Sequence, residues 1–158
     1  MSLLPIGYPL GFLPTGEYKV ERFNESNVNL TGDELVLWAQ VFSSNEIEAD
    51  SFKTLIEKGV VIEFGNNNDF FSLLKNVNAM RLGGGWFADG KYCVEKEKEF
   101  YFLTELQHKI WLDSDGKITV EELFNNIGAE QKGKKEKFEN DFCYSIIYLV
   151  KNELLLLR

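Results

Sequence analysis

The sequence contains an internal repeat, and this feature restricts the possible fold more than any other. Residues 11–21 (GFLPTGEYKVE) align without gaps with residues 85–95 (GWFADGKYCVE). After a one-residue deletion the match continues, and a leucine, a threonine and a tryptophan recur at the same spacing. The matched pairs are Gly11/Gly85, Phe12/Trp86, Gly16/Gly90, Tyr18/Tyr92, Val20/Val94, Glu21/Glu95, Leu30/Leu103, Thr31/Thr104 and Trp38/Trp111. A repeat of this period predicts that one module of about 70 residues occurs twice.

The two copies also end alike. Residues 55–64 (LIEKGVVIEF) and 149–158 (LVKNELLLLR) each combine the end of an amphipathic helix with a continuous apolar run. Near the start of each copy, Gly16 and Gly90 mark hairpin turns, because glycine adopts the positive φ that tight hairpins require. Alternating apolar residues follow both glycines and predict a strand with one buried face. Each copy is therefore expected to run from antiparallel strands through helices to a closing strand.

Helices are predicted by capping boxes, in which a threonine and the side chain three residues later satisfy free backbone amides. The first and second copies carry Thr31-x-x-Glu34 and Thr104-x-x-Gln107, and the second copy adds Thr119-x-x-Glu122 before a helix that ends at Gly128. Trp38 and Trp111 follow the first two boxes and are expected to anchor the core. Further helices are expected over residues 49–58, 69–80 and 136–152.

These elements indicate an α+β fold of two tandem winged-helix-like repeats, each a small antiparallel sheet with about three helices. We expect the first repeat over residues 1–68 and the second over residues 85–158. A linker helix and the glycine-rich joint Leu82-Gly83-Gly84-Gly85 are expected over residues 69–84. Modules of about 70 residues are marginally stable alone, so we expect the apolar runs that end the two copies to form a shared interface.

The second copy carries an ordered series of motifs. In order, they are Leu103-Thr104, Ile110-Trp111, Asp115-Gly116, Thr119-Val120-Glu121-Glu122-Leu123 and a leucine-rich tail from Leu149 to Leu156. This order, over residues 95–156, resembles the PqqD-like family, which includes the leader-peptide recognition elements of modified-peptide biosynthesis. The lysine-rich insertion 130–137 and a first copy truncated in the second-helix region depart from the family pattern. The resemblance implies that the partner is a peptide or a processing enzyme.

Composition and charge exclude several classes of function. The 158 residues include 17 Lys and Arg against 25 Asp and Glu, so a net charge of −8 provides no overall field for nucleic acid or an anionic membrane. Two cysteines and one histidine are too few for a Cys/His metal cluster, and no cofactor is expected. No apolar stretch approaches the ~20 residues of a membrane span, and the first residues do not fit a secretion signal. We therefore expect a cytoplasmic protein.

One segment partly matches a calcium-binding loop. Asp113, Asp115 and Glu122 fall on ligand positions of an EF-hand, but Trp111 stands at the first position, where an oxygen ligand is needed. Glu122 also belongs to a capping box. We therefore expect no metal site. Neither the cysteines nor the histidine lies in a pattern for nucleophilic catalysis, so the sequence indicates no enzyme.

The leading functional hypothesis is a non-catalytic interaction protein. The strand Phe100-Tyr101-Phe102 is aromatic on both faces, and Tyr144, Tyr148 and Lys151 lie beside the apolar stripe of the last helix. A sheet edge next to this helix would form a groove, in which strand addition supplies backbone hydrogen bonds and aromatic pockets select side chains. The aromatic strand is either central and fully buried or offers apolar surface to a partner. The resemblance to the PqqD-like family implies that these six residues line the binding site for a peptide or protein partner.

Two alternatives stay open. The architecture alone favours a DNA-binding regulator, although the candidate recognition helix at residues 50–58 balances its two lysines with two acidic residues. The run Lys132, Lys134, Lys135 and Lys137 could contact an anionic partner, or it could form a mobile solvated insertion. The second alternative is a structural subunit that binds no ligand.

Overall fold

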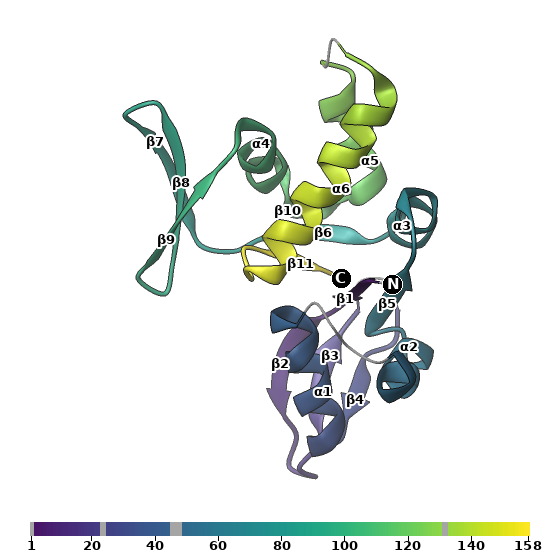
Figure 1. Cartoon of the computed structure of the whole chain (residues 1–158). Coiled ribbons are helices and arrows are strands. Elements are labelled where there is room, and N and C mark those ends of the chain that lie inside the picture. The colour runs from purple at the N-terminus through teal and green to yellow at the C-terminus, as the bar shows by residue number, and fades with distance from the viewer. Residues whose placement is uncertain (1, 23–24, 45–48, 131–132) are drawn as a thin grey trace.

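The first part of the chain forms a strand, a three-stranded antiparallel sheet, helices and a closing strand. The computed structural model describes the chain except for residues 1, 23–24, 45–48 and 131–132 (Figure 1). The elements of this part are β1 (Ser2–Pro5), β2 (Tyr8–Phe12), β3 (Tyr18–Glu21), β4 (Val28–Leu30), α1 (Gly32–Ser43), a 3₁₀ turn (Ala49–Phe52), α2 (Lys53–Glu57) and β5 (Val61–Phe64). The sheet has the order β2-β3-β4, and β5 returns to pair antiparallel with β1.

The second part follows the same order with one insertion. Helix α3 (Asn67–Leu74) connects the parts. The remaining elements are β6 (Asn78–Arg81), β7 (Gly84–Ala88), β8 (Lys91–Lys96), β9 (Glu99–Leu103), α4 (Glu105–Asp113), β10 (Asp115–Thr119), α5 (Val120–Gly128), α6 (Lys135–Lys151) and β11 (Leu155–Leu157). The sheet has the order β7-β8-β9, and β11 returns to pair antiparallel with β6. The inserted strand β10 pairs with the other edge of β6, and α5 follows it.

Equivalent hydrogen bonds close both parts. The Ile6 N–H donates to the carbonyl of Val60 (2.7 Å), and in the second part the Leu82 N–H donates to the carbonyl of Leu154 (2.9 Å). The residue before the acceptor has a positive φ in both parts: 68° at Gly59, before Val60, and 54° at Glu153, before Leu154. The similarity between residues 55–64 and 149–158 therefore corresponds to the same helix end and the same returning strand.

The expected α+β class and the capping boxes are confirmed. Thr31, Thr104 and Thr119 each cap a helix, with their side chains accepting from the backbone N–H three residues later. Several small antiparallel sheets accompany the helices. The assignment of each repeat to the winged-helix class stays a prediction.

Two secondary-structure expectations need correction. The helix predicted over residues 69–80 ends at Leu74, and Asn78–Arg81 forms strand β6. This strand is stabilised from far along the chain, because Asn78 and Arg158 exchange backbone hydrogen bonds of 2.9 Å in both directions. The helix predicted over 49–58 is a 3₁₀ turn followed by only the five residues of α2.

The alignment of the first strand of each sheet also needs correction. Phe12 pairs with Tyr18 across β2 and β3, and Phe87, not Trp86, pairs with Tyr92 across β7 and β8. The register of β2 shifts between Pro9 and Gly11, whereas β7 pairs without interruption. Five residues separate Phe12 from Tyr18 but only four separate Phe87 from Tyr92, so the longer first turn displaces the gapless alignment by one position, and the bulge adds a further residue beyond Gly11.

Strand β1 separates two hydrophobic cores. Leu3 packs into the core of the first part, with Trp38 and Val61, while its neighbour Leu4 packs into the larger core of the second part. Successive residues of a strand point to opposite faces, so one short strand contributes to both cores. A hydrogen bond of 2.6 Å from the Gly7 N–H to the carbonyl of Leu157 joins the two parts further.

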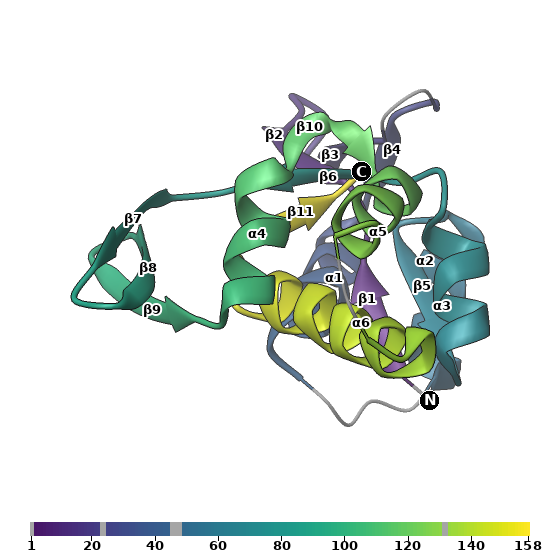
Figure 2. The same ribbon diagram turned by 90° about the horizontal axis from the view of Figure 1, so that it is seen from above.

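The sheet β7-β8-β9 projects from the body of the molecule. Figure 2 shows it standing to one side of α4, with only its base near the other elements. Every residue of β7 is exposed. Among the described residues, no helix combines the length and apolar character needed to cross a membrane.

Candidate functional site

The projecting sheet has two different faces. Trp86, Cys93 and Phe102 are paired across its three strands, so their side chains share one face. In the next row Glu95 pairs with Phe100 on the same face. The rings of Trp86 and Phe100 meet edge to face at a centroid distance of 5.9 Å. We call Trp86, Phe100 and Phe102 the aromatic face.

The opposite face of the sheet packs on α4. The ring of Tyr92 stacks on His108, with a centroid distance of 4.4 Å. The indole of Trp111 lies beside Gly85 and donates to the carbonyl of Leu82 (2.9 Å). Burial lowers the pKa of His108 below its ordinary value. These contacts hold the sheet in place from one side, which leaves the aromatic face directed outward.

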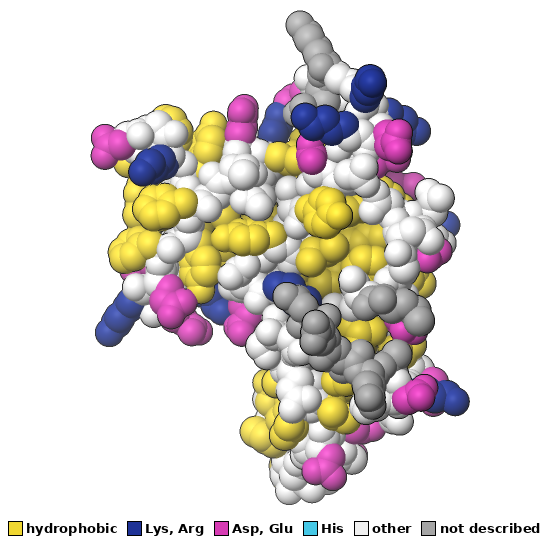
Figure 3. Space-filling model, in the orientation of Figure 1, with side chains coloured by type: hydrophobic (Ala, Val, Ile, Leu, Met, Phe, Trp, Pro, Cys, Tyr) yellow, Lys and Arg dark blue, Asp and Glu magenta, His cyan; other side chains and the backbone are white. Residues whose placement is uncertain are grey.

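The aromatic face is substantially exposed to solvent. Trp86 is 42% exposed, Phe100 58% and Phe102 64%, while Cys93 between them is buried. At roughly 200 Å² for a fully exposed aromatic side chain, these fractions amount to about 330 Å² of apolar surface. Figure 3 shows hydrophobic side chains gathered over the projecting sheet and toward α4 and α6. A patch of this size lies in the range of about 300–600 Å² that often marks an interaction site.

The equivalent positions on the corresponding face of the first part carry no aromatic side chain. Strand pairing places Gly11, Lys19 and Asn29 where the second part has Trp86, Cys93 and Phe102. The Asn29 amide donates to a carboxylate oxygen of Glu17 on this face (3.4 Å). The same strand order and an equivalent row of paired residues therefore form without aromatic residues at these positions, so the fold itself does not require them.

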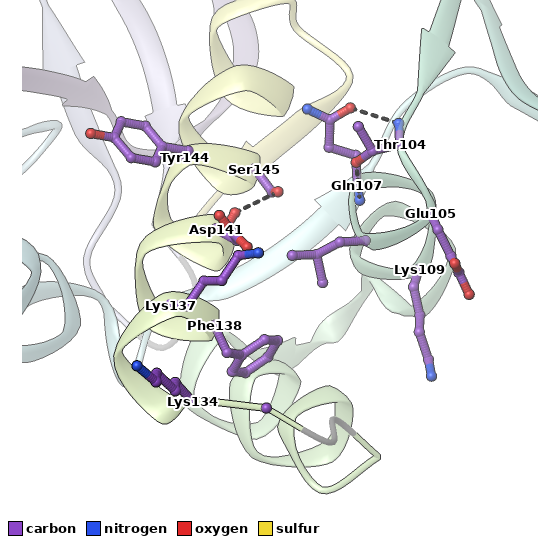
Figure 4. A pocket seen from close by; sticks show the side chains of 12 residues that line it. Thr104, Glu105, Gln107, Lys109, Lys134, Lys137, Phe138, Asp141, Tyr144 and Ser145 are labelled. Atoms are coloured by element: carbon purple, nitrogen blue, oxygen red, sulfur yellow. Dashed lines mark hydrogen bonds between the residues drawn. The ribbon is translucent and has the colours of Figure 1, made fainter.

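The six residues predicted as a binding site fall in three places. Phe100 and Phe102 lie on the aromatic face. Tyr101 is on the opposite face, and Lys151 lines with it a small hollow of about 250 Å³ between β9 and the end of α6. Tyr148, on α6, is near enough to interact electrostatically with the Tyr101 hydroxyl. Tyr144, further toward the start of α6, is exposed, and its ring points away from α4 (Figure 4). The structure thus does not bring all six into one groove.

The hollow between β9 and α6 is polar and its groups are already engaged. The Tyr101 hydroxyl donates to Glu99 (2.7 Å), and this bond raises the pKa of Tyr101 to about 12. The Lys151 ammonium donates to the carbonyls of Val41 and Ser44, at the end of α1. Burial lowers the pKa of Lys151. Lys151 therefore joins the two parts of the molecule, in addition to any role at the surface.

A larger groove of about 720 Å³ lies between α4 and α6. In Figure 4, Phe138, Lys137 and Asp141 point from α6 toward this space, while the ring of Tyr144 points to the other side of α6. The groove has charges of both signs, and Lys109 on its rim forms an ion pair with Glu130. The described lysines of the insertion lie at the start of α6, where Lys135 pairs with Glu139 (3.7 Å). Lys132 lies outside the described residues.

The acidic residues of the partial calcium motif have structural partners. Asp115 accepts hydrogen bonds from the backbone N–H groups of Lys117 (2.8 Å) and Ile118 (3.0 Å), and these bonds lower its pKa. Glu122 accepts from Thr119 in the capping box, and Asp113 is the last residue of α4. Within the described part of the chain, no three His, Cys, Asp or Glu side chains are grouped to hold a metal ion.

Sequence reasoning missed three members of the outward face: Trp86, Lys91 and Glu95. The repeat alignment identifies Trp86 only as the counterpart of Phe12. The signal that identifies it is the Asp89-Gly90 turn, whose residues have φ of 51° and 74°. A two-residue turn with both φ positive fixes the hairpin register, which pairs Trp86 with Cys93 and so sets its face.

Comparison of the chain with protein-family models, with curated proteins and with solved structures finds no match.

Proposed function

We propose that this protein is a non-catalytic interaction protein that binds a peptide or protein partner through the aromatic face of its second repeat. One observation carries the proposal: the two parts build sheets of the same strand order with an equivalent central row, Gly11–Lys19–Asn29 and Trp86–Cys93–Phe102, and only the second part has aromatic side chains in that row, with Phe100 beside them. Because the first part folds without aromatic residues there, the aromatic residues serve something other than the fold.

Burial of the aromatic face against a partner is favourable in free energy. Burying about 330 Å² of apolar surface contributes about 8 kcal/mol before the costs of association are subtracted. Leaving this surface in water gives the isolated chain no such gain. Aromatic side chains also lose little conformational entropy when bound, because they have only two rotatable bonds. The aromatic side chains of this face therefore contribute favourable free energy mainly when a partner buries them.

We place the contact on the aromatic face rather than in the groove between the sheet edge and the last helix. The hollow there is small and lined by charged groups, and Lys151 is engaged by α1. The outer edges of β7 and β9 pair with no other strand in the described structure. A bound peptide can therefore add a strand at either edge while its side chains contact the aromatic face.

DNA binding has less support than partner binding. The candidate recognition helix is reduced to the five residues of α2, which is too short to span a major groove. Its flanking cation Lys58 pairs with Glu34 at 2.7 Å and is partly neutralised. Absence of binding to duplex DNA at low salt would remove this alternative, because screening of phosphate contacts is weakest there.

The test is a selection of peptides from a display library on the wild-type chain, immobilised sparsely so that copies do not meet. Selected peptides are then measured against the variant Phe100→Asn/Phe102→Asn, which places polar side chains on this face in place of two aromatic ones. We expect affinity to fall at least about tenfold, because two hot-spot aromatics are lost. Phe12→Asn, an equally exposed aromatic of β2, is the matched control and leaves binding unchanged. Failure to select any peptide would contradict peptide binding, and selected peptides that are indifferent to the double substitution would contradict the aromatic face as the contact surface.

A further inference from the structure

The charges on the aromatic face point to the partner that covers it. Resting on the function proposed above, we infer that the partner is a second copy of this chain, packed face to face through β7-β8-β9 about a two-fold axis. Cys93 lies at the centre of the face. Lys91 and Glu95 lie on the same face, two residues to either side of it along β8. Because the two opposite charges lie at equal distances from Cys93, this face of one copy is complementary in charge to the same face of a second copy.

The arrangement of the two sheets follows from these charges. When the β8 strands of the copies run antiparallel across the two-fold axis, Lys91 of each copy lies opposite Glu95 of the other. Each charge is displaced from the centre by about 7 Å, and packed sheets are about 10 Å apart, which the two long side chains can bridge. A parallel arrangement would set Lys91 against Lys91. The charge pattern therefore selects the antiparallel arrangement and disfavours the parallel one.

The aromatic side chains give the contact its apolar centre. Trp86 and Phe102 flank the small side chain of Cys93, so the face has two ridges with a depression between them. The Lys91 ammonium lies over the ring of Phe102, 5.4 Å from its centroid, and therefore at the border of this apolar centre. The two-fold axis sets each ridge opposite the same ridge of the other copy, so that the indoles of the two Trp86 residues and the rings of the two Phe102 residues form the apolar contact on either side of Cys93.

The available area predicts a weak dimer. The aromatic face contributes about 330 Å² from each copy, and the stems of Lys91 and Glu95 bring the total to about 1,000 Å². This lies below the ~1,200–2,000 Å² of stable interfaces, so we expect a dissociation constant on the order of 10 μM. The dimer leaves the outer edges of β7 and β9 open.

Sedimentation equilibrium of the full chain, at concentrations spanning this range, tests the inference with a charge swap. Each single reversal, Lys91→Glu or Glu95→Lys, changes two symmetry-related contacts from attraction to repulsion and should weaken the dimer at least about tenfold. The double variant Lys91→Glu/Glu95→Lys restores opposite charges, and we expect its dissociation constant to return to within about threefold of wild type. Lys98→Glu, in the β8–β9 turn, is the control for net charge and should leave the dimer intact.

A wild-type chain that stays monomeric at 100 μM, about ten times the expected constant, would overturn the inference. A double variant that dimerises as weakly as the single variants would also overturn the inference. Exchange of the two charges preserves the self-complementarity of the face and should leave the dissociation constant nearly unchanged. Circular dichroism of each variant checks that the fold is kept. A monomeric chain that still selects peptides on the aromatic face refutes only the second copy as partner. A monomeric chain that selects none refutes the proposed function as well.

Discussion

Substitution of alanine for each of three successive glycines, just before and at the start of β7, should change the free energy of unfolding by very different amounts. A Cβ on Gly83, whose φ is +81°, would lie 2.5 Å from the carbonyl oxygen of Glu95. A Cβ on Gly85 would lie 2.5 Å from Cζ3 of Trp111, whereas one on Gly84 would meet nothing within 4 Å. Close packing therefore requires glycine at positions 83 and 85, whereas position 84 can accept a larger side chain.

The expected magnitudes follow from these contacts. Alanine in the left-handed region costs about 1–2 kcal/mol, and forcing a methyl group against fixed backbone adds about 1–3 kcal/mol, so Gly83→Ala should lose about 3 kcal/mol. Gly85→Ala meets a side chain that can shift, and about 2 kcal/mol is expected. Gly84→Ala should change the free energy of unfolding by no more than about 0.5 kcal/mol.

Urea unfolding followed by tryptophan fluorescence measures the free energy of unfolding of all three variants, and thermal unfolding measures their Tm. For a chain of this length Tm falls about 2–4 °C per kcal/mol, so Gly83→Ala should melt about 9 °C below wild type and Gly84→Ala at almost the same temperature. Equal effects at Gly83 and Gly84 would refute the close approach of Gly83 to Glu95. A neutral Gly85→Ala would refute the packing of Trp111 on the base of the sheet.

Three other predictions concern turns, pH and the contact between the two parts. Lys98 has φ of 72°, so Lys98→Gly should raise the free energy of unfolding by about 1 kcal/mol, and an unchanged urea midpoint would contradict this. Burial lowers the pKa of folded His108, so wild-type stability should decline as pH falls through the unfolded value of about 6.5. His108→Phe keeps a ring against Tyr92 and should remove that decline, whereas the same slope in both proteins would count against it. Lys151→Met removes hydrogen bonds to the end of α1 and should cost about 2 kcal/mol, and a neutral result would show that these bonds contribute nothing.

Local signals predicted the features that depend on neighbouring residues. Thr31, Thr104 and Thr119 cap helices as expected, because a capping box is complete within four residues. The α+β class followed from the same signals. The spacing of the repeat landmarks was also recoverable, because Tyr18 and Tyr92 occupy equivalent positions in the two sheets.

Features that depend on distant residues were predicted poorly. Asn78–Arg81 has no strand pattern of its own, and it pairs with two strands that are both distant in the sequence, Asp115–Thr119 on one edge and Leu155–Leu157 on the other. The bulge in β2 is visible only once the pairing with β3 is known. Phe100 and Phe102 were found as candidate contact residues, but their exposure depends on α4 covering the opposite face, which the sequence does not display.

Hydrogen–deuterium exchange of the full chain tests most directly whether the second sheet is the contact surface. The chain is compared well below and well above the expected dissociation constant of about 10 μM. We expect added protection at the higher concentration within residues 84–103, and none within residues 8–30, which build the equivalent sheet without aromatic side chains at the matching positions. Equal protection in both segments, or no dependence on concentration anywhere, would contradict the account.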